Sequence, residues 1–166
     1  NISRGGSLCG AVTDPDRLAG WIARNTERLV EGLDRHGFCC ERLLLILTFK
    51  DDGVEQRRAA LPAAAADFPT LYRTAMRLLA DCRPAGRAVS YMHLIAEGLV
   101  PRGRTQLSLF DRPDARQKAI AVVKRTVNER VGRFALRSGA TLPLADVYRD
   151  EANAYDICDI YGKTCF

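Results

Sequence analysis

Residues 42–50 alternate so regularly that they constrain the fold more than any other part of the chain. The odd-numbered positions from 43 to 49 are all large and apolar, whereas the even-numbered positions begin with Arg42 and end with Lys50. Because successive side chains of a strand point to opposite faces, one face of this strand is buried and the other carries a cation at each end. The pattern predicts a strand in a sheet that has one covered face and one open face.

A hairpin follows this strand. Asp51-Asp52-Gly53 is a turn sequence, and residues 54–61 form a second extended segment that carries Arg57 and Arg58. A short Asp/Gly turn between two extended segments predicts antiparallel pairing. Since the side-chain period of a strand is two, only one of these adjacent arginines can face the open side, and the sequence leaves open which one.

Two helices are expected, each beginning at an aspartate. Asp14-Pro15 supplies an N-cap and a first-turn proline, and apolar residues then recur at helical spacing until His36-Gly37 ends the helix. Asp67 begins the second helix, which ends within residues 82–86. Both helices need a partner surface for their apolar sides, and the covered face of the sheet provides it.

Residues 2–12 and 87–96 are the two further extended segments, and Gly98 is expected to close the last one. The order is then strand, helix, strand, strand, helix, strand. This βαββαβ pattern predicts an α+β fold, with a four-stranded antiparallel sheet and two helices on one face. Residues 114–131 predict a further helix in a C-terminal extension, and the tail beyond residue 139 is expected to be irregular.

Arginine dominates the charge of the chain. Its 25 basic residues face 20 acidic ones, for a formal net charge of +5, and only Lys50, Lys118, Lys124 and Lys163 are lysines. Guanidinium binds phosphate bidentately, so the excess suits a polyanionic partner. A GC-rich coding sequence explains abundant arginine and alanine equally well. No apolar run approaches the roughly 20 residues that cross a bilayer, so no membrane partner is expected.

The cysteines are expected to be reduced and mostly buried. Neither C-x-x-C pairs nor zinc-site spacings occur, and only two histidines are present, so no metal site is expected. In the tail, Cys158 and Cys165 could be combined with Asp156 and Asp159, but their spacing fits no metal site and a packed tail with incidental thiols is favoured. The six cysteines are Cys9, Cys39, Cys40, Cys82, Cys158 and Cys165.

The most specific motif is Gln106-Leu107-Ser108-Leu109-Phe110, which matches the bacterial sliding-clamp-binding motif at all five positions. Leu109 and Phe110 would anchor in an apolar pocket of the clamp, and Gln106 would hydrogen-bond at a neighbouring small site. The alternative is that the apolar residues belong to a core strand. The motif lies in a polar, linker-like stretch just after a complete sheet, which favours clamp binding.

Taken in order, these features resemble the little finger domain of Y-family translesion DNA polymerases. The resemblance covers about residues 1–110 and is carried by Ile2-Ser3-Arg4, the strand over 42–50, the Arg57-Arg58 strand, the Ile95–Leu99 segment and the clamp motif. The long extension is more similar to the UmuC/ImpB/MucB/SamB branch than to the DinB branch, although the tail departs from the UmuC pattern.

The resemblance divides the chain into three parts. Residues 1–100 would be the DNA-binding domain, 101–113 a linker that carries the clamp motif, and 114–166 a helix with a tail of unknown role.

The resemblance implies that the open sheet face grips primer–template DNA. Contacts in the family go mainly to phosphates, from basic side chains and backbone N–H groups, so binding is largely independent of sequence. The implied partners are primer–template DNA and the bacterial sliding clamp. The implied DNA-binding candidates are Ser3, Arg4, Arg42, Lys50, Arg57 and Arg58.

The chain itself is expected to be catalytically inert. In the family, carboxylates of a palm domain hold two Mg²⁺ ions, in motifs resembling Asp-x-Asp-x-Phe and Ser-x-Asp-Glu, and neither motif occurs here. The chain begins at Asn1 without Met, which indicates a piece of a longer polymerase whose palm would bind Mg²⁺.

Two other functions stay open. The parent could be a non-catalytic, ImuB-like adaptor between the clamp and a polymerase, or the chain could be a free-standing regulatory α+β domain whose clamp-like segment is part of the core. The first interpretation places the protein in the cytoplasm, at the nucleoid, in DNA damage tolerance and the SOS response.

Overall fold

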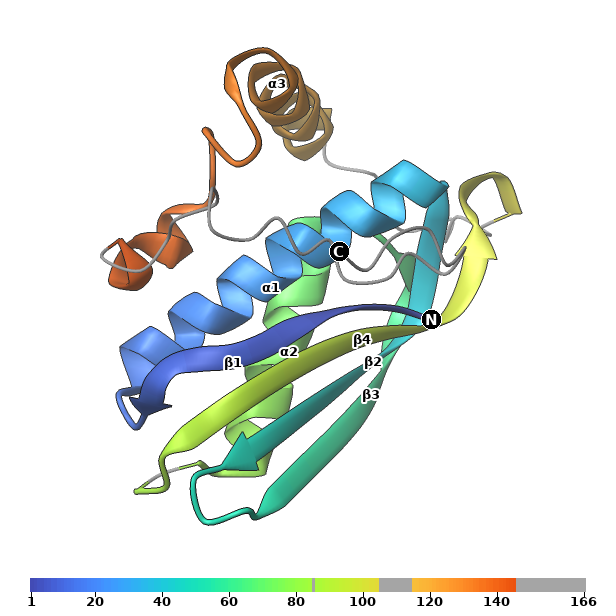
Figure 1. Cartoon of the computed structure of the whole chain (residues 1–166). Helices are drawn as coiled ribbons and strands as arrows, with labels where there is room; N and C mark the ends of the chain where they lie inside the picture. Colours follow the sequence, from blue (N-terminus) through green and yellow to red (C-terminus); the bar gives the residue numbers. More distant parts are fainter. Residues whose placement is uncertain (85, 105–114, 146–166) are drawn as a thin grey trace, which may run out of the picture.

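The computed structural model describes residues 1–84, 86–104 and 115–145. A four-stranded antiparallel sheet forms its scaffold, in the order β1-β4-β2-β3 (Figure 1). The central strands β2 and β4 pair with each other, and β1 and β3 are the edges. The strands are β1 (Ile2–Val12), β2 (Phe38–Phe49), β3 (Val54–Ala65) and β4 (Val89–Pro101).

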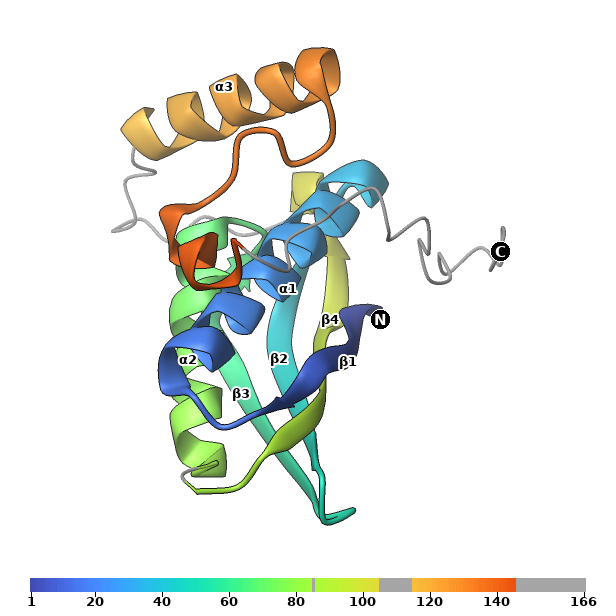
Figure 2. The same ribbon diagram turned by 60° about the vertical axis from the view of Figure 1, so that its left-hand side comes forward.

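Helices α1 (Pro15–His36) and α2 (Phe68–Cys82) cover one face of the sheet and leave the other face open (Figure 2). Each helix begins where its aspartate predicts. The carboxylate of Asp14 accepts a hydrogen bond from the Asp16 N–H at 3.0 Å, and that of Asp67 accepts one from the Thr70 N–H at 2.9 Å. The expected α+β fold with its βαββαβ order is confirmed.

The strand boundaries differ from those expected from the sequence. β2 ends at Phe49, so Lys50 belongs to the turn that follows. β3 continues beyond Leu61 to Ala65, past Pro62, which is tolerated because β3 is an edge strand. β4 runs through Gly98 rather than ending there, since this residue adopts the left-handed backbone conformation, with φ of 62°, without breaking the pairing with β2.

The core lies between the sheet and the two helices. On β2 the odd-numbered residues from Leu43 to Phe49 are buried against them. Leu44 is also buried but lies outside the core cluster, because its side chain belongs to the other face. The helices contribute fully buried leucines to the same core, among them Leu29, Leu33, Leu71 and Leu78.

The C-terminal extension packs back onto α1. After η1 (Arg102–Arg104) and α3 (Ala115–Val131), the chain returns to α1, where Phe134 is buried and η2 (Gly139–Leu144) inserts Leu144. A Cβ at Gly20 would lie 3.0 Å from Cγ of Leu144, so the glycine allows this approach. The expectation of an irregular tail beyond 139 is therefore wrong for residues 139–144, because a buried leucine anchors them.

Three acidic residues of α1 hold the extension by ion pairs. Glu27, Glu31 and Asp34 are spaced by four and three positions, which puts them on one side of the helix. Glu27 pairs with Lys124 and accepts a hydrogen bond from the Ser138 N–H at 2.6 Å. Glu31 is bound by the forked guanidinium of Arg133, with a closest distance of 2.6 Å, and Asp34 pairs with Arg102.

The apolar side of α3 expected from the sequence does not pack against the core. Ile120 and Val123 are about half exposed, at 49% and 57%, and Val131 is exposed as well. The ion pairs to α1, rather than an apolar seam, therefore hold this helix near the domain.

The two faces of β2 should respond differently to truncation. We expect Leu45→Ala to lower the free energy of unfolding by about 2–5 kcal/mol, because it leaves a cavity in the core. Ile46→Ala, one residue along and on the open face, should cost less than half as much. Urea denaturation followed by circular dichroism measures both variants. Equal losses would contradict the one-sided core.

Candidate nucleic-acid interface

The strand register arranges the open face into rows that cross all four strands. Directly opposed residues of antiparallel strands point to the same face, so each row is read from the pairing alone. Three rows are complete and a fourth lies at the β4 end. The rows, written from β1 to β3, are Ser3, Ile95, Leu44, Arg58; Gly5, His93, Ile46, Gln56; Ser7, Tyr91, Thr48, Val54; and, from β4 to β3, Glu97, Arg42, Ala60.

The register decides between the two adjacent arginines of β3. Arg58 is opposite Leu44 and lies on the open face, with its side chain 58% exposed. Arg57 is opposite Leu45 and lies on the helix side, where its Nε donates to the carbonyl of Asp81 at 3.3 Å. Arg57 also pairs with Glu55 at 3.0 Å. Of these two candidates, only Arg58 is placed to meet a ligand on the open face.

Strand β1 separates two further candidates. Ser3 faces the open side, opposite Ile95. Arg4 is opposite the buried Leu94 and lies on the helix side, with Nη2 only 2.9 Å from where a Cβ at Gly32 of α1 would be. Grouping Ser3 with Arg4 in one site is therefore wrong, because adjacent residues of a strand cannot share a face.

The two cations at the ends of β2 lie far apart along the strand. Arg42 is on the open face and lies 3.7 Å from a carboxylate oxygen of Glu41. Lys50 is exposed in the turn beyond β2, where its N–H donates to the carbonyl of Ala88 at 2.8 Å. Arg42 and Arg58 therefore form the basic part of the sheet surface, and Lys50 marks its opposite end.

Glu97 is a charged residue of this face that sequence reasoning missed. Its carboxylate binds the Arg58 guanidinium in a fork, at 2.7 Å to Nε and 3.1 Å to Nη2. The Glu97 side chain is only 14% exposed. No sequence signal marks this pair, because the two residues are 39 positions apart and meet only through the pairing of β3 and β4 with β2.

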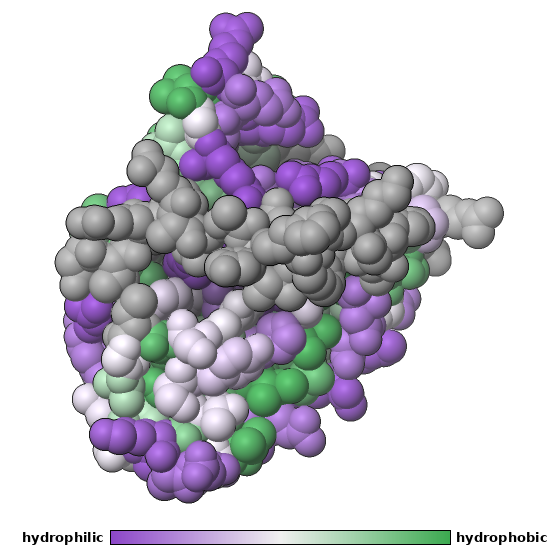
Figure 3. Space-filling view, viewed as in Figure 1, coloured by the Kyte–Doolittle hydropathy of each residue, from purple (hydrophilic) through white to green (hydrophobic). Residues whose placement is uncertain are grey.

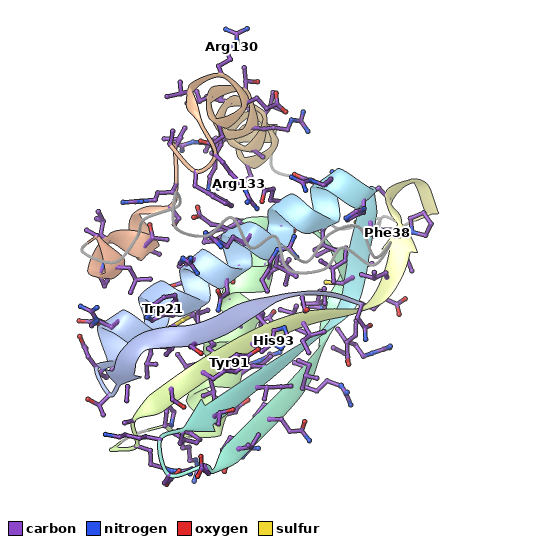
Figure 4. The ribbon with its side chains drawn as sticks, in the orientation of Figure 1. Trp21, Phe38, Tyr91, His93, Arg130 and Arg133 are labelled. Carbon is purple, nitrogen blue, oxygen red and sulfur yellow. The ribbon has the colours of Figure 1, made fainter. Side chains whose placement is uncertain are left out.

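Tyr91 and His93 of β4 form an aromatic pair at the centre of the face. Their ring centroids are 5.9 Å apart and their planes make 82°, an edge-to-face arrangement (Figure 4). A Cβ at Gly5 of the neighbouring strand would lie 2.9 Å from Cδ2 of His93, so the glycine leaves room for this ring. Burial lowers the pKa of His93, which favours the neutral imidazole.

The face is polar and apolar in turn rather than uniformly basic. Among the described residues of its rows, Arg42, Arg58 and Glu97 are the charged ones. Figure 3 shows white and green residues over the visible part of this face, with purple, hydrophilic residues along its lower margin. Such a surface can bind phosphates through two guanidinium groups, hydroxyls and backbone N–H groups, without a strong field of its own.

The other expected sites are only partly within the described residues. Cys39, Cys40 and Cys82 are free and buried, and burial raises the pKa of Cys40 to about 12, so this thiol stays protonated. In the described ranges there is no group of three or more His, Cys, Asp or Glu residues that could hold a metal. The same part of the chain contains no helix long and apolar enough to cross a membrane.

Two sequence expectations fall outside the described residues. The clamp-like motif, Gln106 to Phe110, is one of them. The tail with Cys158 and Cys165 is the other.

Solved structures share this fold. The chain is similar to the little finger domain in a complex of a beta-clamp processivity factor with that domain of PolIV, at 20% identity and a TM-score of 0.50, covering 66% of this chain and 98% of that one. It is similar to Dbh DNA polymerase in an insertion ternary complex, at 14% identity and a TM-score of 0.51, covering 60% of this chain and 29% of that one.

A third similar structure is DinB from Sulfolobus solfataricus, at 14% identity and a TM-score of 0.51, covering 60% of this chain and 28% of that one. This chain therefore spans less than a third of these two polymerase chains. A comparison with curated proteins finds no match.

The sheet with two helices on one face is thus the little finger fold of Y-family DNA polymerases. The model of the impB/mucB/samB family C-terminal domain matches residues 1–109, and the chain belongs to this family. The extension from α3 onward lies beyond the matched residues.

The buried imidazole should make stability depend on pH. Because burial lowers the pKa of His93, the unfolded chain binds a proton that the folded chain resists as the pH falls below about 6.5. The contribution is present above that pH and is lost on acidification. We expect His93→Gln to lose less stability than the wild type between pH 7.5 and pH 5.5, measured by urea denaturation. An unchanged pH dependence would contradict this.

Proposed function

We propose that this chain is the DNA-gripping and clamp-tethering part of a Y-family translesion DNA polymerase. The observation that carries the proposal is the open sheet face of a little finger fold, on which the register brings Arg42 and Arg58 to the same end. Phosphates of a primer–template duplex would bind these guanidinium groups and the neighbouring hydroxyls. Binding of this kind is largely independent of base sequence, which suits an enzyme that copies damaged templates.

The expected grip is weak. Two arginines on a surface that also carries Glu97 neutralise few phosphates, so the affinity of the isolated chain for DNA should be modest and strongly salt-dependent. Ser3 and the exposed Lys50 would add contacts at the margins of the face.

Tethering to the sliding clamp would compensate for the weak grip. The motif Gln106-Leu107-Ser108-Leu109-Phe110 supports this proposal, and the similar little finger domain of PolIV is itself in a complex with a beta-clamp processivity factor. A tether raises the local concentration of the polymerase at the primer end without adding DNA contacts.

Catalysis would belong to the rest of the parent chain. We propose that a palm domain outside this chain holds the Mg²⁺ ions that polymerase chemistry requires. The protein would act in DNA damage tolerance within the SOS response, in the cytoplasm at the nucleoid.

The first test removes the basic part of the face. We expect Arg42→Ala with Arg58→Ala to weaken binding to a fluorescent primer–template roughly tenfold, and to make the salt dependence of log K shallower by about two, because each lost phosphate contact removes about 0.9 from the slope. Arg57→Ala is the matched control, since Arg57 is adjacent but lies on the helix side. Wild-type binding that ignores salt, or an equal effect of the control, would sink the proposed DNA face.

The second test addresses the clamp. Two apolar anchors of a short linear motif should bind with roughly micromolar affinity after the cost of ordering the segment. We expect Leu109→Ala with Phe110→Ala to abolish binding to the purified bacterial clamp in a titration up to about 50 μM. Ile120→Ala with Val123→Ala, which also removes exposed apolar side chains, should leave binding unchanged. If the wild type does not bind, or the motif variant binds equally well, the motif is not a clamp ligand.

A further inference from the structure

The open face contains an acidic residue where a DNA-binding surface would be expected to exclude one. Glu97 is directly opposite Arg42 on β2 and forms its fork with Arg58 on β3, so it lies between the two basic residues of the face. Since β3 and β4 are separated by β2, the fork crosses the central strand.

The fold does not need this fork to align its strands. β2 already pairs with β3 from Cys40 to Thr48 and with β4 from Phe38 to Phe49. The ion pair connects side chains on a surface that is otherwise open, and exposed pairs of this kind contribute little to stability. Its position therefore calls for a role in binding.

The geometry determines what the fork does to Arg58. It occupies Nε and Nη2 at 2.7 Å and 3.1 Å and holds the guanidinium against the sheet surface. The carboxylate is the less accessible partner, because Glu97 is 14% exposed and Arg58 is 58% exposed. A ligand that approaches the face thus meets the guanidinium first, with its charge already compensated from below.

We propose that Glu97 is an internal counter-ion that competes with DNA phosphate for Arg58, and that it keeps the grip of the open face weak and readily released. This inference rests on the proposed DNA-binding function. A phosphate that binds Arg58 must displace the carboxylate or lie close to it, and either event offsets part of the gain. A polymerase domain tethered by other means benefits from such a surface, because the DNA must slide past it after each nucleotide.

The test is the isosteric, uncharged variant. We expect Glu97→Gln to bind a fluorescent primer–template roughly three- to tenfold more tightly than the wild type at low salt. The slope of log K against log salt should become steeper by about 0.9, because Arg58 then contributes a full phosphate contact. Glu55→Gln is the matched control, since it removes the same charge and an ion pair from the helix side of the sheet.

A double-variant cycle separates competition for Arg58 from general repulsion of DNA by a negative charge. In an Arg58→Ala background the gain from Glu97→Gln should shrink to less than half of its original factor. An undiminished gain would show that Glu97 acts on the phosphate directly and would overturn the proposal. Thermal unfolding of each variant verifies the fold, and Glu97→Gln should melt within a few degrees of the wild type.

The outcomes also distinguish this inference from the proposed function. If the wild type binds DNA with the expected salt dependence but Glu97→Gln binds no more tightly, or the Glu55→Gln control shows the same gain, the counter-ion role is wrong and the DNA face stands. If neither the wild type nor Glu97→Gln binds DNA, both ideas fail together.

Discussion

Burial of one face of β2 beneath α1 and α2 is the constraint on which the rest of the structure depends. The strand pairs on both sides, so the residues that it sends into the core from Leu43 to Phe49 determine the register of β3 and β4 as well. A slip of one residue would exchange the two faces and place Arg42 in the core. The same burial therefore stabilises the domain and places Arg42 and Arg58 on the open side.

Electrostatic pairing recurs on both sides of this scaffold. On the outer side of α1, Glu27, Glu31 and Asp34 each bind a cation from a segment beyond β4, and Phe134 and Leu144 add apolar anchors. On the open face, Glu97 binds Arg58. In both places an acidic residue with little exposure holds a longer basic side chain, which explains why an arginine-rich chain presents a sheet surface with little net charge.

Much of the fold was predictable because local signals were strong. Asp14, Asp67 and Gly37 marked helix ends through capping chemistry that involves only neighbouring residues, and the alternation over 42–50 indicated a one-sided sheet. Boundaries were less predictable where local signals conflict with tertiary pairing. Pro62 and Gly98 interrupt a strand pattern in the sequence, yet β3 and β4 continue past them because the pairing with β2 continues.

The sequence by itself determined the class of fold, the order of its elements and the two-sided character of β2, since periodicity and capping act over a few residues. Tertiary structure alone decided which arginines share a surface. Arg57 and Arg58 are chemically identical neighbours, and only the register with β2 sends one to α2 and the other to the open face. It also decided that Glu97 meets Arg58, because contacts across three strands depend on pairings that no local pattern encodes.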